Sequence, residues 1–114
     1  MGAGYHGGFG KTKGASKSIV YAKSKEIALT RKKLLPVKIQ TSYIKYVKNS
    51  TTSKYTDYRV SKTNTGYLYQ SKKLGDVPGS YAVYYKEVDF DGQTIRVYKD
   101  TYDNKGVLIH RKYK

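Results

Sequence analysis

The sequence predicts an α+β fold, in which a short N-terminal helical part packs on a twisted antiparallel β-sheet that ends in a three-stranded meander. A stretch of good helix formers lies early in the chain, at residues 25–35. The last third, residues 81–114, contains three runs rich in Val, Ile and Tyr, separated by DFDG and DNKG. Each separator has Asp first and Gly fourth, a pattern typical of a type I turn that ends in a left-handed Gly and closes an antiparallel hairpin.

The chain divides into a leader and one domain. Residues 1–14 are rich in glycine, which loses much backbone entropy on ordering, so we expect a flexible leader. Residues 15–114 are the length of one small domain and are predicted to form a single basic α+β domain.

The helical part is predicted over Lys25 to Leu35, with Ser24 as its N-cap and Pro36 ending it. Its apolar face would consist of Ile27, Ala28, Leu34 and Leu35. Its basic run would stay in water, either as a solvated helix end or as a nucleic-acid contact, and consists of Arg31, Lys32 and Lys33.

Strands are predicted for most of the remaining chain. Residues 36–48 alternate apolar and polar side chains, which favours a strand with a bend near its middle. Short strands are expected at Tyr55–Val60 and Gly66–Lys72. The two glycines and one proline of Lys72–Ser80 predict a loop before the meander.

Composition and charge restrict the function. The formal net charge of +15 over 114 residues indicates a polyanionic partner, either nucleic acid or an anionic membrane surface. Residues 1–80 hold 16 Lys and Arg against 3 acids, and residues 81–114 hold 7 against 5. The attraction is therefore expected mainly from the part before the meander.

Several classes of protein and site are excluded. The sequence has no apolar run long enough for a membrane span and no secretory signal at its start. The absence of cysteine excludes disulfides and thiolate metal sites. The 14 tyrosines, against 2 phenylalanines, predict a core that is edged with tyrosine hydroxyls. We expect no cofactor and no metal.

The two turns fix a predicted register for the meander. Regular pairing outward from each turn sets Lys86 opposite Arg96 and Asp100 opposite His110. One face would then be a core face, with Val83, Tyr85, Ile95, Val97, Val107 and Ile109. The other face would gather Tyr84, Lys86, Arg96, Tyr98, Asp100, Tyr102, Leu108, His110 and Lys112. A slip of one residue would exchange the faces and bring in Lys99 and Thr101 in place of Arg96 and Tyr98.

The predicted polar face has the groups that metal-independent RNA cleavage needs. His110 would transfer protons near neutrality, and Asp100 would orient its ring. Arg96 would hold the phosphate through its planar fork, and Tyr98 would donate a proton or stack on a base. The predicted catalytic set is therefore His110, Arg96, Tyr98 and Asp100. The predicted nucleic-acid contacts are Tyr84, Lys86, Tyr102 and Lys112, together with Arg31, Lys32 and Lys33.

Two segments resemble the C-terminal toxin modules of polymorphic toxins of Gram-positive bacteria and their phages. They are the opening GAGYHGGFGKTKG and the closing YKEVD-x-DG-x-T-x-R-x-YK-x-TYD-x-x-G-x-x-x-H-x-K. The resemblance implies a ribonuclease toxin, with a barnase/EndoU/colicin/RelE-like fold. It also implies a cognate immunity protein as partner, RNA (tRNA among the candidates) as substrate, and a cytoplasmic site of action after delivery from another cell.

Three functions therefore stay open. The first is a basic ribonuclease of the toxin type. The second is a nucleic-acid-binding module of a phage or mobile element that stacks and neutralises without chemistry. The third is a protein-interaction domain whose sheet edge pairs with a partner strand.

Overall fold

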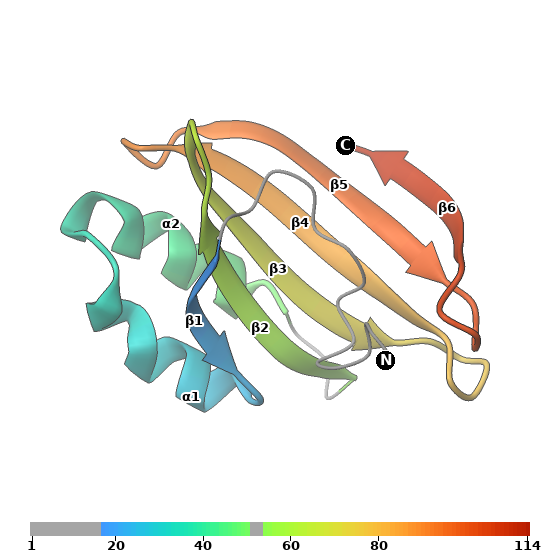
Figure 1. Ribbon diagram of the computed structural model, residues 1–114. Coiled ribbons are helices and arrows are strands. Elements are labelled where there is room, and N and C mark those ends of the chain that lie inside the picture. The colour runs from blue at the N-terminus through green and yellow to red at the C-terminus, as the bar shows by residue number, and fades with distance from the viewer. Residues whose placement is uncertain (1–16, 51–53) are drawn as a thin grey trace.

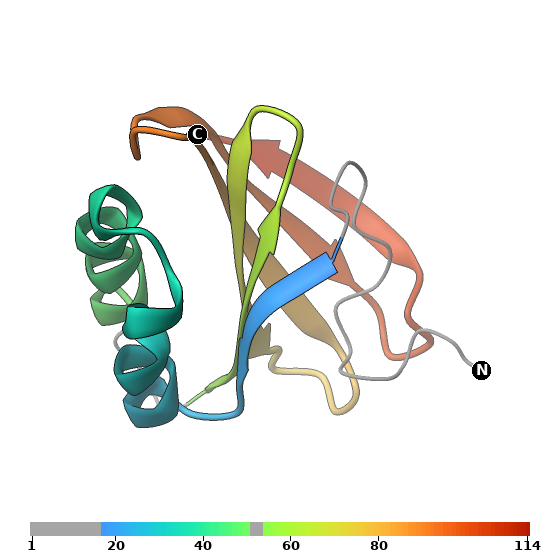
Figure 2. The ribbon, with the colours of Figure 1, turned by 60° about the vertical axis from the view of Figure 1, so that its left-hand side comes forward.

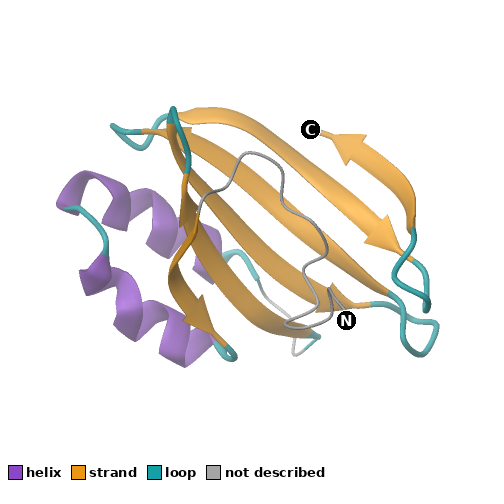
Figure 3. Ribbon diagram, viewed as in Figure 1, coloured by secondary structure: helices purple, strands orange, loops and turns teal. Residues whose placement is uncertain are grey.

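The computed structural model describes residues 17–50 and 54–114, and the predicted flexible leader, residues 1–14, lies outside them. The strands of the described part form one antiparallel sheet in the order of the sequence, with helices inserted between the first two strands (Figures 1 and 3). The predicted α+β class is confirmed. The elements are β1 (Lys17–Ala22), α1 (Lys25–Thr30), the 3-10 helix η2 (Arg31–Leu34), α2 (Val37–Lys48), β2 (Tyr55–Lys62), β3 (Gly66–Leu74), β4 (Tyr81–Asp89), β5 (Thr94–Tyr102) and β6 (Leu108–Tyr113).

The helices lie on one side of the twisted sheet, against β1–β3, and leave β5 and β6 beyond them (Figures 1 and 2). We call this side of the sheet the helix-side face and the other side the far face. The main core lies between the helices and the helix-side face, and includes Val20, Ala28, Leu35, Ile39, Tyr43, Val47, Tyr58, Val60 and Tyr69. A smaller buried cluster on the far face consists of Leu68, Val83, Tyr85 and Tyr102.

The first helical segment begins at Lys25 as predicted, but its α-helix ends at Thr30 instead of Leu35. Ser24 caps it, because its Oγ accepts a hydrogen bond from the backbone N–H of Ile27 at 3.2 Å. The helix tightens into η2 at Arg31, and Pro36 follows. Its predicted apolar face is only half right. Ala28 and Leu35 are buried, whereas Ile27 and Leu34 are exposed. For Leu34 the reason is the 3-10 turn, which rotates the later side chains away from an α-helical stripe.

The strand predicted over residues 36–48 is wrong, and the segment is the helix α2. Val, Ile, Thr and Tyr favour strands by propensity, and apolar side chains alternate with polar ones at the start of the segment. The same segment also has an apolar repeat of about four residues, which fits a helix. Ile39, Tyr43 and Val47 recur every fourth residue and are the buried residues of the helix. Burial of this stripe against the sheet outweighs the local preference.

The other strand predictions are confirmed with longer bounds, and β1 was missed altogether. Residues 17–22 read KSIVYA, a short run next to the predicted helix, and Val20 and Ala22 pack into the main core. Among the described residues, no helix is both long and apolar enough to cross a membrane.

Tyrosine hydroxyls tie α2 to α1 and to the sheet. The composition predicts them at the edge of the core, whereas Tyr43 and Tyr69 are buried inside it. The hydroxyl of Tyr43 donates to the carbonyl oxygen of Ala28 at 2.7 Å, and that of Tyr46 donates to the carbonyl oxygen of Tyr84 at 2.5 Å. The Tyr69 hydroxyl lies 2.5 Å from Ser42 Oγ. Burial raises the pKa of Tyr69 to about 12, so its hydroxyl keeps its proton at neutral pH.

The two Asp-to-Gly turns have the predicted geometry. Asp89 and Gln93 pair at the first turn, and Asp103 and Val107 pair at the second. Each Asp carboxylate accepts two backbone N–H bonds across its own turn. The fourth residue of each turn has positive φ, 86° at Gly92 and 81° at Gly106.

Each hairpin contains one extra residue beyond its turn. Val88 pairs with Thr94 while Glu87 pairs with Arg96, so Ile95 has no partner and forms a bulge in β5. In β6 the same position after the turn, Ile109, lies between the partners of Tyr102 and Thr101. Ile95 and Ile109 are exposed, as is Val107, so none of the three belongs to the predicted core face.

A pair of alanine substitutions tests whether residues 37–48 form a helix or a strand. In a strand, Val37 and Ile39 would share a face, and replacing either by alanine would lower the free energy of unfolding by a similar amount. In α2 they differ, because Val37 is 80 % exposed and Ile39 is 0 % exposed. We expect Ile39→Ala to lower the free energy of unfolding by about 2–5 kcal/mol and Val37→Ala by less than about 0.5 kcal/mol. Equal losses in urea denaturation would contradict the helix.

Candidate functional site

The bulges shift the predicted pairing of the meander by one residue. Beyond Ile95 the structure pairs Lys86 with Val97 rather than with Arg96. Beyond Ile109 it pairs Asp100 with Arg111, and His110 with Thr101. Directly opposite residues of antiparallel strands share a face, so the predicted polar face is wrong as a single cluster.

The eight predicted site residues of the meander fall into two groups of four on opposite faces. Arg96, Tyr98, Asp100 and Tyr102 share the far face, where they lie beside the buried cluster of Val83 and Tyr85. The remaining four share the helix-side face, because Tyr84 and Lys86 are opposite Ser71 and Tyr69 of β3, and Lys112 is opposite Lys99. That group consists of Tyr84, Lys86, His110 and Lys112. His110 is thus separated from Arg96 and Asp100 by the thickness of the sheet.

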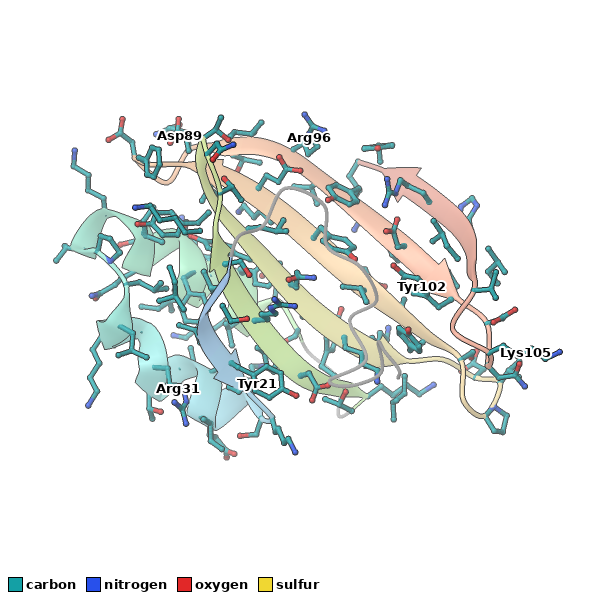
Figure 4. The ribbon with its side chains drawn as sticks, in the orientation of Figure 1. Tyr21, Arg31, Asp89, Arg96, Tyr102 and Lys105 are labelled. Carbon is teal, nitrogen blue, oxygen red and sulfur yellow. The ribbon has the colours of Figure 1, made fainter. Side chains whose placement is uncertain are left out.

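The predicted contacts Arg31, Lys32 and Lys33 are exposed on η2. This segment belongs to the helical part, and Figure 4 shows Arg31 well apart from Arg96 and Tyr102 of β5. The structure therefore does not bring the η2 cations together with either group of the meander.

On the far face, Asp100 holds Arg111 in a fixed position. Arg111 Nε and Nη2 donate to the two carboxylate oxygens of Asp100 at 2.5 and 2.6 Å. Asp100 is 1 % exposed, whereas the side chain of Arg111 is 43 % exposed. These hydrogen bonds raise the pKa of Arg111 above its usual value. These two bonds occupy one edge of the guanidinium, which stays permanently charged.

A second ion pair lies four residues back along β5, at Arg96. Arg96 is opposite Glu87, and Arg96 Nε lies 3.8 Å from Glu87 Oε2. Tyr98 lies between the two ion pairs. Its ring stacks on Tyr85 at 4.5 Å, and the Arg111 guanidinium lies 5.1 Å from its centroid.

The environment of Tyr98 fixes its protonation state. Burial, and then the Glu87 carboxylate, raise the pKa of Tyr98 to about 12, against the lowering effect of Arg111. The phenol therefore keeps its proton at neutral pH and is a donor rather than a base. The arrangement presents a carboxylate acceptor, two guanidinium groups and a phenol donor on neighbouring strands.

Sequence reasoning missed Glu87 and Arg111 as members of this cluster, although a signal was present. Regular pairing set Lys86 against Arg96, which is a like-charge pair and unfavourable. A slip of one residue sets Glu87 against Arg96 and Asp100 against Arg111, which are two opposite-charge pairs. Cross-strand charge matching would therefore have favoured the observed register.

Comparisons of the chain with family models, with curated proteins and with solved structures found no match. Within residues 17–50 and 54–114, no three His, Cys, Asp or Glu side chains are grouped so that they could hold a metal ion.

A double-mutant cycle tests the buried ion pair. Arg111→Met leaves the Asp100 carboxylate buried without its cation, and we expect a loss of about 3 kcal/mol in the free energy of unfolding, the low end for a broken buried pair because Arg111 is half-exposed. Adding Asp100→Leu should restore much of that loss, because no unpaired charge then remains. Strictly additive losses in urea denaturation would show that the two residues are not coupled.

Proposed function

We propose that this protein is a metal-independent ribonuclease, and that the reaction takes place on the far face at Glu87, Arg96, Tyr98 and Arg111. One observation carries the proposal: a carboxylate, two guanidinium groups and a protonated phenol lie on β4, β5 and β6 within one network of contacts. These are the proton acceptor, the phosphate donors and the proton donor that cleavage at a 2′-hydroxyl needs.

In the proposed reaction, Glu87 accepts the proton of the 2′-hydroxyl as the 2′-oxygen attacks the neighbouring phosphorus. The bond from phosphorus to the 5′-oxygen breaks, and Tyr98 donates its proton to that leaving oxygen. A proton from water then restores Tyr98, and Glu87 returns its proton to solvent. The products are a 2′,3′-cyclic phosphate and a 5′-hydroxyl.

Two cations support the charge that develops on the phosphate. Arg96 lies beside Glu87, so it can hold a phosphate oxygen close to the base. Arg111 is oriented by Asp100, which makes Asp100 a positioning residue. Asp100 thus keeps its predicted importance in a different role, and His110 has no part in the reaction.

The resemblance to polymorphic toxin modules supports the toxin part of this proposal. In that setting the substrate is RNA in the cytoplasm of a target cell, and a cognate immunity protein blocks the site. Binding of nucleic acid without cleavage is the second candidate function. It is favoured by the position of His110 on the opposite face of the sheet from Arg96, because the predicted histidine-based site does not form there.

Cleavage of total RNA and of tRNA in the presence of a chelator tests the proposal. We expect the parent protein to cleave, and Glu87→Gln to lower the rate by about 10²–10⁴-fold because it removes the general base without changing the shape of the side chain. Arg96→Gln should also lower the rate by about 10²-fold or more.

His110→Ala distinguishes cleavage at the far-face site from cleavage that depends on His110. Cleavage that survives His110→Ala and fails in Glu87→Gln supports the far-face site, and the reverse result would restore the histidine mechanism. Binding of RNA by the parent protein without any turnover would favour the second candidate function.

A further inference from the structure

The helix-side face of β4–β6 carries cations without any acidic neighbour on the same face. Lys86 extends from β4, Lys99 from β5 and Lys112 from β6. All eight acidic residues of the chain lie within the described part, and none extends from β4, β5 or β6 on this face. Asp91, in the turn between β4 and β5, reaches the helix side but pairs there with Lys38 of α2 at 3.1 Å. Asp57, Glu87 and Asp100 are on the far face, Glu26 is on α1, and the others are Asp76, Asp89, Asp91 and Asp103 at loops and turns.

The pairing on this face is electrostatically unfavourable. Lys99 is directly opposite Lys112, and like charges at opposite positions of antiparallel strands destabilise the pair. The far face of the same strands differs, since its two cross-strand charged pairs are both of opposite sign. An anion bound between Lys99 and Lys112 would relieve their repulsion, so the free energy lost to this pair would be regained on binding.

One further cation, Lys114, lies with Lys99 at the ring of Tyr84, which is opposite Lys99. The Nζ atoms of Lys99 and Lys114 lie 5.5 and 5.7 Å from the centroid of its ring. A backbone hydrogen bond from Lys114 N to the Val97 carbonyl oxygen, at 2.9 Å, holds the chain beside β5. Three ammonium groups and one aromatic ring therefore share a small area, a combination typical of surfaces that bind single-stranded nucleic acid.

We propose that this area, Tyr84 with Lys99, Lys112 and Lys114, holds a single strand of RNA through its phosphates. The inference deepens the proposed function, on which it rests for RNA as the ligand. β6 is the end strand of the described sheet, and its consecutive side chains alternate between faces. Lys112 and Arg111 therefore lie on the two sides of one edge, so a strand that crosses β6 passes from the lysine area to the far-face site.

Lys112→Glu gives the sharpest test, because it predicts opposite changes in two measurements. It converts the like-charge pair with Lys99 into an ion pair, so thermal unfolding at low salt should shift up by about 2–4 °C. The probe for binding is a labelled 2′-O-methyl RNA of about ten nucleotides, which cannot be cleaved. Its binding should weaken at least fivefold, and the slope of log K against log salt should become shallower by about 0.7 or more.

Lys23→Glu is the matched control, since it makes the same charge change on an exposed residue between β1 and α1. We expect Lys112→Glu to lose clearly more affinity than Lys23→Glu. Equal losses, or parental binding by Lys112→Glu, would overturn the inference. So would tighter binding to vesicles that contain phosphatidylserine than to the oligonucleotide. Because the probe cannot be cleaved, the binding measurement tests this inference whether or not the protein cleaves RNA.

Discussion

One unpaired residue in each of the last two strands determines which side chains of the meander act together. The Asp-to-Gly turns begin the pairing, and the bulges at Ile95 and Ile109 then displace it by one position. Because side chains alternate across a strand, this displacement decides which cations meet carboxylates and which do not. The same register pairs Asp100 with Arg111 and sets Lys99 opposite Lys112, without a carboxylate partner on that face of the strands.

The result is a sheet whose two faces differ in charge. Residues 81–114 have a formal net charge close to zero, and on that basis attraction for a polyanion is expected from the earlier part of the chain. Counted by face, Glu87 and Asp100 compensate the two arginines that the meander places on the far face, and the lysines of β4–β6 on the other face have no acidic partner on those strands. Near neutrality over a segment therefore conceals a strongly basic surface on one of its sides.

Sequence reasoning predicted the features that depend on local chemistry. The cap at Ser24, the two turns and the strands of the meander each follow from a few neighbouring residues, and all are present. It failed where distant contacts decide. The segment that contains Ile39 and Tyr43 is a helix because the sheet beneath it buries every fourth residue. The bulges are likewise invisible locally, since Ile95 and Ile109 are good strand residues in themselves.

The bulges also determine how the meander tolerates changes in length. Deletion of Ile95 or Ile109 would leave every other cross-strand partner in place, because these residues have none of their own. Deletion of a paired residue such as Val97 would instead move all later side chains of that strand to the opposite face. Related chains can therefore differ by one residue at these two positions and keep both surfaces, whereas a gap elsewhere in β5 would exchange them.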